Sequence, residues 1–376
     1  MKNNLNKRFL EKFYDLFEAE DDLITSENEA EFTQLKADIK SGINSSVRNR
    51  IKANSNIAPP VTNMKLWVRY AGVAAAMVLI GFSVFFFNNE PDSTEFAAKV
   101  DQQIKPGGNN AVLTLANGKQ IILNDSQNGN IAAQGSVSIK KSAEGLITYL
   151  AGDHVERGSK AAEVAMNTIS TPKGGQYKVV LPDGSQVQLN AESSLTFPAA
   201  FAAGLREVQL TGEAFFMVAK DAARPFRVIS GSHSVEVLGT HFNVNAYSDE
   251  ASIKTTLLEG AVRVSADNHN ELLQPGQQSA AQKTGTMALT KRTVNVDKYV
   301  AWTNGYFSFA NDDVKSVLRQ IGRWYDVDII YDGAVSGVFS GELFRSSKLS
   351  TVLNILEING LHFEVRNKTI TVSQIN

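Results

Sequence analysis

A single long apolar run divides the chain into two unequal parts. From Tyr70 to Phe87 the sequence reads YAGVAAAMVLIGFSVFFF, which is 18 residues without a charge. As an α-helix these residues would rise about 27 Å, close to the hydrocarbon thickness of a bilayer. Trp67 and Arg69 suit the interfacial end of such a helix. The pattern therefore predicts a transmembrane helix over residues 67–87.

A buried core helix and a cleaved signal peptide are the alternative interpretations of this run. A core helix of this length normally carries more polar interruptions. A signal peptide would begin close to the N-terminus and end at small residues, whereas this run ends in FFFNNEPD. The membrane-spanning interpretation agrees best with the pattern.

The charges on the two sides of the run predict its orientation. Acidic and amide residues follow it as far as Lys99, whereas basic residues precede it. The basic residues are Arg48, Arg50, Lys52, Lys65 and Arg69. The positive-inside rule then places residues 1–66 in the cytoplasm and 88–376 outside it. The chain has no cysteine, which permits an oxidising compartment and removes disulfides and thiolate metal sites.

Two amphipathic helices are predicted in residues 1–53, ahead of a linker at 54–66 that contains Pro59-Pro60. So few residues, with one apolar stripe on each helix, bury little core by themselves. We therefore expect a partner protein to cover the stripes, and a self-contained helical hairpin is the alternative. The candidate contacts are Phe9, Phe13, Phe32, Leu35 and Ile39.

Short β-rich runs separated by turn residues fill residues 109–293, after a spacer over 88–108. Hairpins are predicted at VLTLANGKQIILN (112–124) and VVLPDGSQVQLN (179–190), around Asn-Gly and Pro-Asp-Gly turns. Leu, Gly, Gln, Leu and Asn recur in both at an offset of 66 residues, which indicates duplicated hairpin units. This alternation of short β-rich runs and turn residues predicts an all-β domain, either a sandwich or a solenoid.

Strand and helix patterns alternate in residues 299–376. A strand at 306–309, a helix capped by Asn311 and a strand at 326–331 form one β-α-β unit. The pattern recurs about 35 residues later, so a small α+β domain with two β-α-β repeats is predicted. Trp324 lies on the apolar stripe of the first helix and is expected in the core.

Composition and motifs argue against an enzyme that acts on a separate substrate. A net charge of −2 with 20% charged residues gives no basic field for nucleic acid. The histidines do not share metal-ligand spacing, and no nucleophile-elbow, zinc-protease or phosphate-loop motif occurs, so no metal and no cofactor are expected. Asp183, Glu213 and Glu259 lie beside glycines in turns or at strand ends and are predicted to be structural. A hydrolase whose carboxylates meet only in the fold is the remaining enzymatic alternative.

Four segments of the all-β region resemble the FecR family of transmembrane sigma-factor regulators. Residues 299–376 also resemble the C-terminal signalling domain of Bacteroidota-type members, and are similar to the short N-terminal domain of TonB-dependent transducers. The four segments are TPKGGQYKVVLPDGSQVQLNAESSLTFP (171–198), REVQLTGEAFFMVAKDAARPFRV (206–228), VEVLGTHFNVNAY (235–247) and LLEGAVRVS (257–265).

The resemblance implies an anti-sigma factor in the inner membrane, with its C-terminus in the periplasm. Its cytoplasmic helices would hold an extracytoplasmic-function sigma factor. The resemblance leaves open whether the protein inhibits this sigma factor or assists it. Its periplasmic part would contact the signalling domain of an outer-membrane TonB-dependent transporter, with Trp302, Tyr306 and Tyr325 as candidate contacts. The alternative is a membrane-anchored periplasmic module that binds a ligand or glycan, with Trp302 and Tyr306 lining its site.

Gly239-Thr240 in VLGTHFNV resembles a Gly-Thr pair at which some FecR-family regulators cleave their own backbone. The Thr240 hydroxyl would attack the Gly239 carbonyl, and water would hydrolyse the resulting ester. Alternatively, Gly239 marks a bulge or bend and Thr240 fills a β position. In either case the strands VEVL and HFNV are predicted to pair in one sheet.

Overall fold

The computed structural model describes residues 100–124, 127–134, 137–142, 146–151, 165–283, 288–358 and 360–375. The predicted cytoplasmic helices, the linker and the predicted membrane-spanning segment lie outside the described residues. Within the described ranges no helix is long and apolar enough to cross a bilayer.

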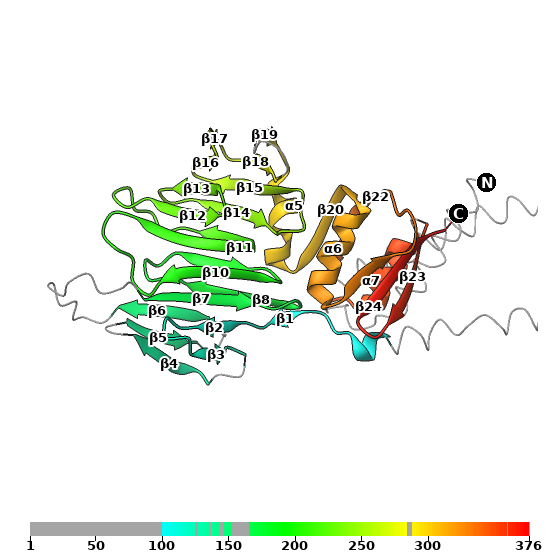
Figure 1. The fold of residues 1–376 in the computed structure, drawn as a ribbon, viewed down its shortest axis with the longest axis horizontal. Coiled ribbons are helices and arrows are strands. Elements are labelled where there is room, and N and C mark those ends of the chain that lie inside the picture. Colours follow the sequence, from blue (N-terminus) through cyan, green and yellow to red (C-terminus); the bar gives the residue numbers. More distant parts are fainter. Residues whose placement is uncertain are drawn as a thin grey trace, which may run out of the picture. The chain divides into compact units, whose positions relative to one another are not determined.

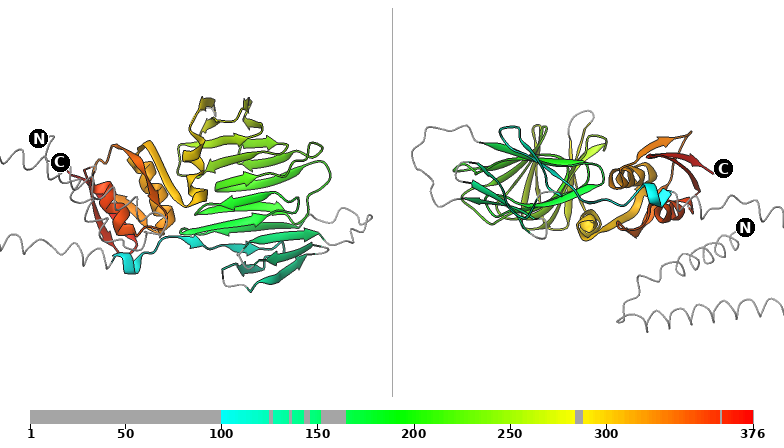
Figure 2. Two further views of the ribbon diagram at one scale, coloured as in Figure 1. Left: turned by 180° about the vertical axis from the view of Figure 1, so that it is seen from behind. Right: turned by 90° about the horizontal axis from the view of Figure 1, so that it is seen from below.

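Alternating apolar and polar residues build two β-ladders that face each other across one apolar core. In strands such as FRVIS (226–230) and HSVEV (233–237) every second residue is buried, as expected for strands with one face against a core. Strands follow one another along the stack in Figure 1, and Figure 2 shows the two layers from below. The predicted all-β domain is therefore confirmed as a sandwich in which the chain winds between two ladders.

The first ladder is antiparallel except at one pair, β11 with β12. In spatial order its strands are β3 (Gln120–Ile122), β2 (Val112–Thr114), β7 (Met166–Thr171), β10 (Ser193–Pro198), the first half of β11 (Arg206–Met217), β12 (Phe226–Ser230), β13 (His233–Val237), β16 (Val262–Ala266) and β17 (His269–Leu273).

The second ladder is antiparallel except between β6 and β8. In spatial order its strands are β4 (Gly129–Gln134), β5 (Val137–Lys141), β6 (Ile147–Ala151), β8 (Gly175–Val180), β9 (Gln186–Leu189), the second half of β11, β14 (His241–Ala246), β15 (Ser252–Glu259), β18 (Gln277–Gln282) and β19 (Leu289–Thr293). The short strand β1 (Gly108–Asn109) runs parallel to β8.

The long strand β11 belongs to both ladders and joins them. It pairs with β10 and β12 through residues 206–211 and with β9 and β14 through 212–217. Gly212 stands at the crossing point with φ +82°, a conformation that glycine adopts readily. A Cβ atom there would come within 2.4 Å of the Ser193 hydroxyl oxygen.

The duplicated hairpins have the same turn and the same register, which confirms the predicted repeat. Gly118 N donates to Leu115 O at 2.8 Å, and Gly184 N donates to Leu181 O at 2.9 Å. The β2–β3 pairs and the β8–β9 pairs coincide after a shift of 66 residues. The two copies nevertheless lie in different ladders.

One prediction about this domain is wrong. VEVL forms part of β13 and the segment that follows it, and HFNV forms part of β14, but these strands do not pair with each other. β13 pairs with β12 and β16, whereas β14 pairs with β11 and β15. The chain passes from the first ladder to the second between them, at Gly239, whose φ is +151°.

The C-terminal domain packs two helices and two small sheets around a second apolar core (Figure 1). The helix α5 and the 3-10 helix η2 connect it to β19. The connection consists of α5 (Val296–Val300) and η2 (Ala301–Asn304). The domain itself consists of β20 (Tyr306–Asp313), α6 (Val314–Tyr325), β21 (Asp328–Tyr331), β22 (Val338–Phe344), α7 (Leu349–Glu357), β23 (Leu361–Arg366) and β24 (Thr369–Gln374).

Both predicted β-α-β units are present in chain order, but each unit contributes to both sheets. The strands that precede the helices, β20 and β22, pair with each other, whereas β21 pairs with β24. Asn311 does not cap α6: it lies in β20 with φ +55°, and Asp313 is the cap, accepting from Ser316 N. Trp324 is buried, as predicted.

We expect Gly212→Ala to destabilise the sandwich, because the new methyl group meets backbone and side-chain atoms of residues 192–193 as well as an unfavourable φ. Gly118→Ala is the matched control, since Gly118 has φ +81° with open space around it. The thermal midpoint should fall by several degrees more for Gly212→Ala. Equal shifts would contradict a steric role for this crossing.

His233 should make stability depend on pH. Burial lowers the pKa of His233 to about 4, against 6.5 for the exposed side chain. The unfolded chain therefore binds a proton between these pH values while the folded chain does not, so acidification through this window costs on the order of 3 kcal/mol. His233→Gln should flatten the fall of the melting midpoint between pH 6.5 and 4, and His269→Gln, at the exposed first residue of β17, should not. If the melting midpoint falls equally with pH in the wild type and in both variants, this prediction is wrong.

Candidate functional site

The first part of the candidate site is the segment that follows the predicted membrane span. Residues 100–103 are helical, and Val100 and Ile104 are buried in the core of the C-terminal domain. The predicted spacer over 88–108 therefore includes residues that pack into this domain. Burial of these two side chains contributes roughly 3–6 kcal/mol before entropy costs. We call residues 100–104 the clasp.

Asp101 fixes the clasp to the N-terminus of α7. Its carboxylate accepts from Ser350 N at 3.1 Å and from the Ser350 hydroxyl at 2.7 Å. The N-cap residue of α7 itself, Lys348, makes no side-chain capping bond. A residue far away in the sequence thus supplies the cap, and its negative charge lies at the positive end of the helix dipole.

Close backbone packing continues from the clasp into the β domain. Gly108 N donates to Gly174 O at 2.9 Å, and Gly174 N donates to Arg323 O at 2.7 Å. A Cβ atom at Gly107 would lie 2.7 Å from both the Trp324 ring and Gly174 O. Glycine is therefore required where the chain passes between the two domains.

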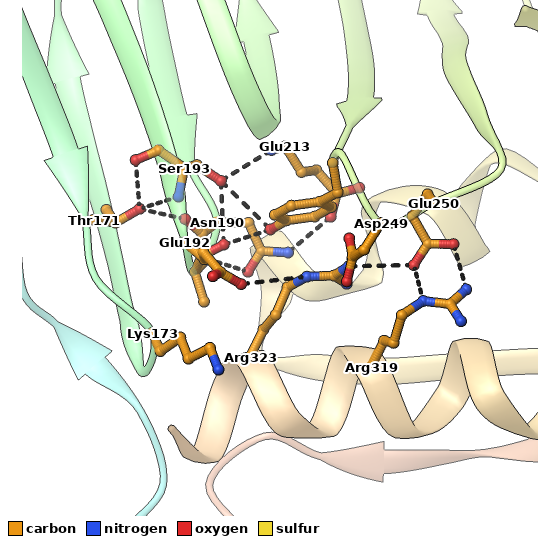
Figure 3. A network of polar contacts seen from close by, with 12 residues as sticks. Thr171, Lys173, Asn190, Glu192, Ser193, Glu213, Asp249, Glu250, Arg319 and Arg323 are labelled. Carbon is orange, nitrogen blue, oxygen red and sulfur yellow. Dashed lines mark hydrogen bonds and ion pairs between the residues drawn. The ribbon is translucent and has the colours of Figure 1, made fainter. Parts of the chain in front are cut away.

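Two arginines of α6 bind acids in the turn that follows β14 (Figure 3). Arg319 makes two bonds to the Glu250 carboxylate, at 2.9 and 2.7 Å. Arg323 bonds to Asp249 and, at 3.3 Å, to Glu250, and its guanidinium lies 3.8 Å from the centre of the Tyr247 ring. Because the arginines are four residues apart, they share one face of α6.

A third arginine, Arg345, lies after β22 and is only 3% exposed. It donates to Asn190 Oδ1 at 2.8 Å and to Trp302 O at 3.2 Å, and lies 3.6 Å from the centre of the Trp324 ring. Asn190 in turn donates to Glu213 at 2.8 Å, so one amide bridges a buried cation and a buried carboxylate. Burial lowers the pKa of Arg345 to about 10, and the group stays charged at neutral pH.

The structure separates the three predicted transporter contacts. Trp302 is buried, and its indole NH donates to Asn243 Oδ1 at 3.2 Å. Tyr325 is buried as well, and its hydroxyl donates to Ser347 O at 2.7 Å. Tyr306 is 37% exposed and packs on Phe344, with 4.9 Å between ring centres. Of these three residues, only Tyr306 is open to a partner in this conformation.

Gly239 and Thr240 lie in the connection that leads into β14. The Thr240 hydroxyl is buried and donates to Ala261 O at 3.1 Å. A Cβ atom at Gly239 would lie 2.5 Å from the Lys220 side chain, so glycine is required there for close packing. The bend predicted as the structural role of Gly239 is present, and cleavage at this bond stays a prediction.

The remaining predicted site residues, Phe9, Phe13, Phe32, Leu35 and Ile39, lie outside the described residues. The sequence predictions missed Asp101 and the three arginines. Arg319 and Arg323 have a detectable signal, a four-residue spacing on the polar face of a predicted helix. Asp101 and Arg345 have no local pattern, because their partners are far away in the chain.

Comparisons with known proteins agree on both domains. The model of the family described as "FecR protein" matches residues 167–263, and that described as "FecR, C-terminal" matches 306–372. No curated protein sequence matches the chain.

Two crystal structures of a "putative anti-sigma factor" from Parabacteroides distasonis ATCC 8503 are similar to this chain. The first has 30% identity and a TM-score of 0.53, covering 56% of this chain and 99% of that one. The second has 29% identity and a TM-score of 0.53, covering 56% of this chain and 100% of that one.

Asp101→Ala should loosen the clasp, because α7 loses a cap worth about 1 kcal/mol. Amide hydrogen exchange of residues 100–104 and of the first turn of α7 should accelerate about fivefold. Gln103→Ala, an exposed neighbour in the same segment, is the control and should leave exchange unchanged. Equal protection in both variants would show that the cap does not hold the clasp.

Self-cleavage at Gly239-Thr240 predicts a fragment that begins at Thr240. The purified full chain should release it during prolonged incubation, as measured by intact mass. Thr240→Ser keeps the hydroxyl and should keep cleavage, whereas Thr240→Ala should abolish it. A chain that stays intact throughout would reject the reaction.

Proposed function

Because this chain belongs to the FecR family, we propose that it is a single-pass anti-sigma factor of the inner membrane. The helices of residues 1–53 would bind an extracytoplasmic-function sigma factor in the cytoplasm. The periplasmic part would receive a signal from an outer-membrane TonB-dependent transporter. The proposal is supported by the family match of both domains and by the structural likeness to a protein described as an anti-sigma factor.

The clasp is the observation that best supports the proposed relay of a signal from the periplasmic part to the cytoplasmic helices. The segment that would leave the membrane helix at residue 87 enters the core of the C-terminal domain at Val100, after 12 intervening residues. A partner that binds the C-terminal domain would therefore act directly on the segment that follows the predicted membrane helix. No signal has to travel through the whole β domain.

The energies of the clasp suit a switch. Apolar burial of roughly 3–6 kcal/mol and a cap of about 1 kcal/mol oppose a cost of similar size for ordering the five residues of the segment. A partner changes such an equilibrium only through the difference in its affinity for the two states. A transporter domain that prefers the C-terminal domain with the clasp released would thus alter the membrane helix and, through it, the cytoplasmic helices.

Tyr306 and Phe344 form the surface that we propose for the transporter. They lie opposite each other on paired strands, and they are 37% and 48% exposed. Exposed aromatic pairs of this kind are typical anchors of protein interfaces. Trp302 and Tyr325 would support this surface from inside the domain.

Replacing Leu35 and Ile39 by Asp should release the sigma factor, because each buried apolar side chain contributes about 1.5–3 kcal/mol. The test is co-purification of the full chain with its sigma factor. Gln34→Asp with Ser41→Asp places the same two charges on the opposite face of the predicted helix and serves as control. Undiminished binding by the Leu35/Ile39 variant would contradict the proposal.

A further inference from the structure

The clasp covers a surface of the C-terminal domain that this domain does not complete by itself. Val100 and Ile104 are buried, and they belong to the same apolar core as the inner faces of α6 and α7. The segment lies beside α7 in Figures 1 and 2. Without these two side chains, part of this core would be exposed to water. We call the surface that residues 100–104 cover the clasp site.

The polar part of the clasp site is the N-terminus of α7, which has no capping group of its own. Lys348 occupies the N-cap position without a side-chain bond, and the first turn has no acidic residue. The helix α6 differs, because its own Asp313 accepts from Ser316 N. For α7 the acceptor is Asp101, 249 residues away in the sequence, which binds the amide and the hydroxyl of Ser350. The clasp site therefore takes its carboxylate from outside the domain.

The clasp presents its contacts in a pattern that any short piece of helix can reproduce. Residues 100–103 are helical, and Ile104 N donates to Val100 O at 2.9 Å. Positions four apart lie on one face of a helix, which brings these two apolar side chains to the same side. Gln102 and Gln103 between them are exposed. The clasp site thus recognises an apolar residue, an acid directly after it, and a second apolar residue three positions further on.

The clasp is a displaceable occupant of this site. Burial and capping only offset the cost of ordering its residues, so the closed state is favoured by little. As a tethered segment it nevertheless has an effective concentration in the millimolar range. A partner that is already bound elsewhere on the same domain, as we propose for the pair Tyr306 and Phe344, gains a comparable effective concentration and can compete with the clasp.

We propose that the clasp site is a docking site for a partner segment with this apolar-acidic-x-x-apolar pattern, which takes the place of the clasp. Such a segment satisfies the amide and the hydroxyl of Ser350 and covers the apolar core, so its binding and the closure of the clasp exclude each other. The inference rests on the proposed function only for the identity of the partner, the signalling domain of the transporter. Docking at this site releases the segment that follows the predicted membrane helix.

The experiment measures the binding of labelled peptides to the purified full chain in detergent by fluorescence anisotropy. One peptide has the sequence of residues 98–106, AKVDQQIKP, and a second, AKLEQQLKP, represents a foreign segment of the same pattern. Val100→Ser with Ile104→Ser gives a chain with an uncovered clasp site, the open chain, and both peptides should bind it. The wild type and the matched control, Gln102→Ser with Gln103→Ser, keep the site covered and should bind the peptides at least about threefold more weakly.

Coupling between the acid of the peptide and Ser350 shows where the peptide binds. Replacing this acid by alanine should weaken binding to the open chain about three- to tenfold, as expected for the loss of hydrogen bonds. In an open chain that also carries Ser350→Ala, the same replacement should weaken binding less, because one of the two donors is already absent. Equal effects in both chains would place the peptide elsewhere and overturn the proposal.

Amide hydrogen exchange of the wild-type chain is a second measurement that needs no variant. Excess of either peptide should accelerate exchange in residues 100–104 while the first turn of α7 stays protected. Unchanged exchange of the clasp in excess peptide would overturn the proposal, also where the open chain does not fold.

Three further outcomes decide the proposal with a folded open chain. Failure of both peptides to bind it, or equal affinity for the open and the wild-type chain, would contradict docking at the clasp site. Binding of AKVDQQIKP without binding of AKLEQQLKP would mean that the site accepts only the clasp itself, and would also overturn the proposal. Co-purification with the sigma factor is measured separately, so a chain that binds both peptides but no sigma factor contradicts only the proposed function.

Discussion

The junction depends on the need of buried guanidinium groups for acceptors at fixed positions. Arg345 and Arg323 are 3% and 5% exposed, so water cannot replace their partners. Those partners come from the β domain and its connection: the Asn190 amide, the carboxylates of Asp249 and Glu250, and the carbonyl of Trp302. Because a guanidinium donates in a planar fork, these acceptors admit one docking orientation.

Buried charges of this kind define the orientation of the docked domains more than they stabilise the docked state. Burial lowers the pKa of Arg345, because the guanidinium loses part of its hydration when the two domains dock. On separation the arginines and acids would regain water, so the ion pairs add little to the net cost of opening. A junction that is well defined and separable is suited to a chain whose proposed role is to change state when a partner binds.

Steric constraints add to the electrostatic ones. Gly107 lies against Trp324 and Gly174 O, where no side chain fits. Asp101 and the apolar residues of the clasp hold the chain immediately before this point. The path of residues 100–107 is therefore fixed by the same domain whose arginines fix the docking, so movement of one requires movement of the other.

Local physics made much of this fold predictable from the sequence. Alternation of apolar residues predicted the β domain, because the side chains of a strand point to opposite faces. The repeated Leu, Gly, Gln, Leu and Asn predicted two identical hairpins, because a turn and its register are set by a few neighbouring residues. The apolar stripe of α6 likewise predicted that Trp324 is buried.

Only the tertiary structure decided which ladder each strand joins and which residues meet at the junction. β13 and β14 are neighbours in the sequence, yet the bend at Gly239 sends them to different ladders. Asp101 caps a helix 249 residues away, and Arg345 reaches Asn190 across 155 residues. Such pairs produce no periodic pattern in the sequence. Each partner belongs to an element whose own local pattern is regular, and the two meet only when the domains dock. The sequence thus determined the elements and the family resemblance, and packing determined the clasp and the partners of the buried arginines.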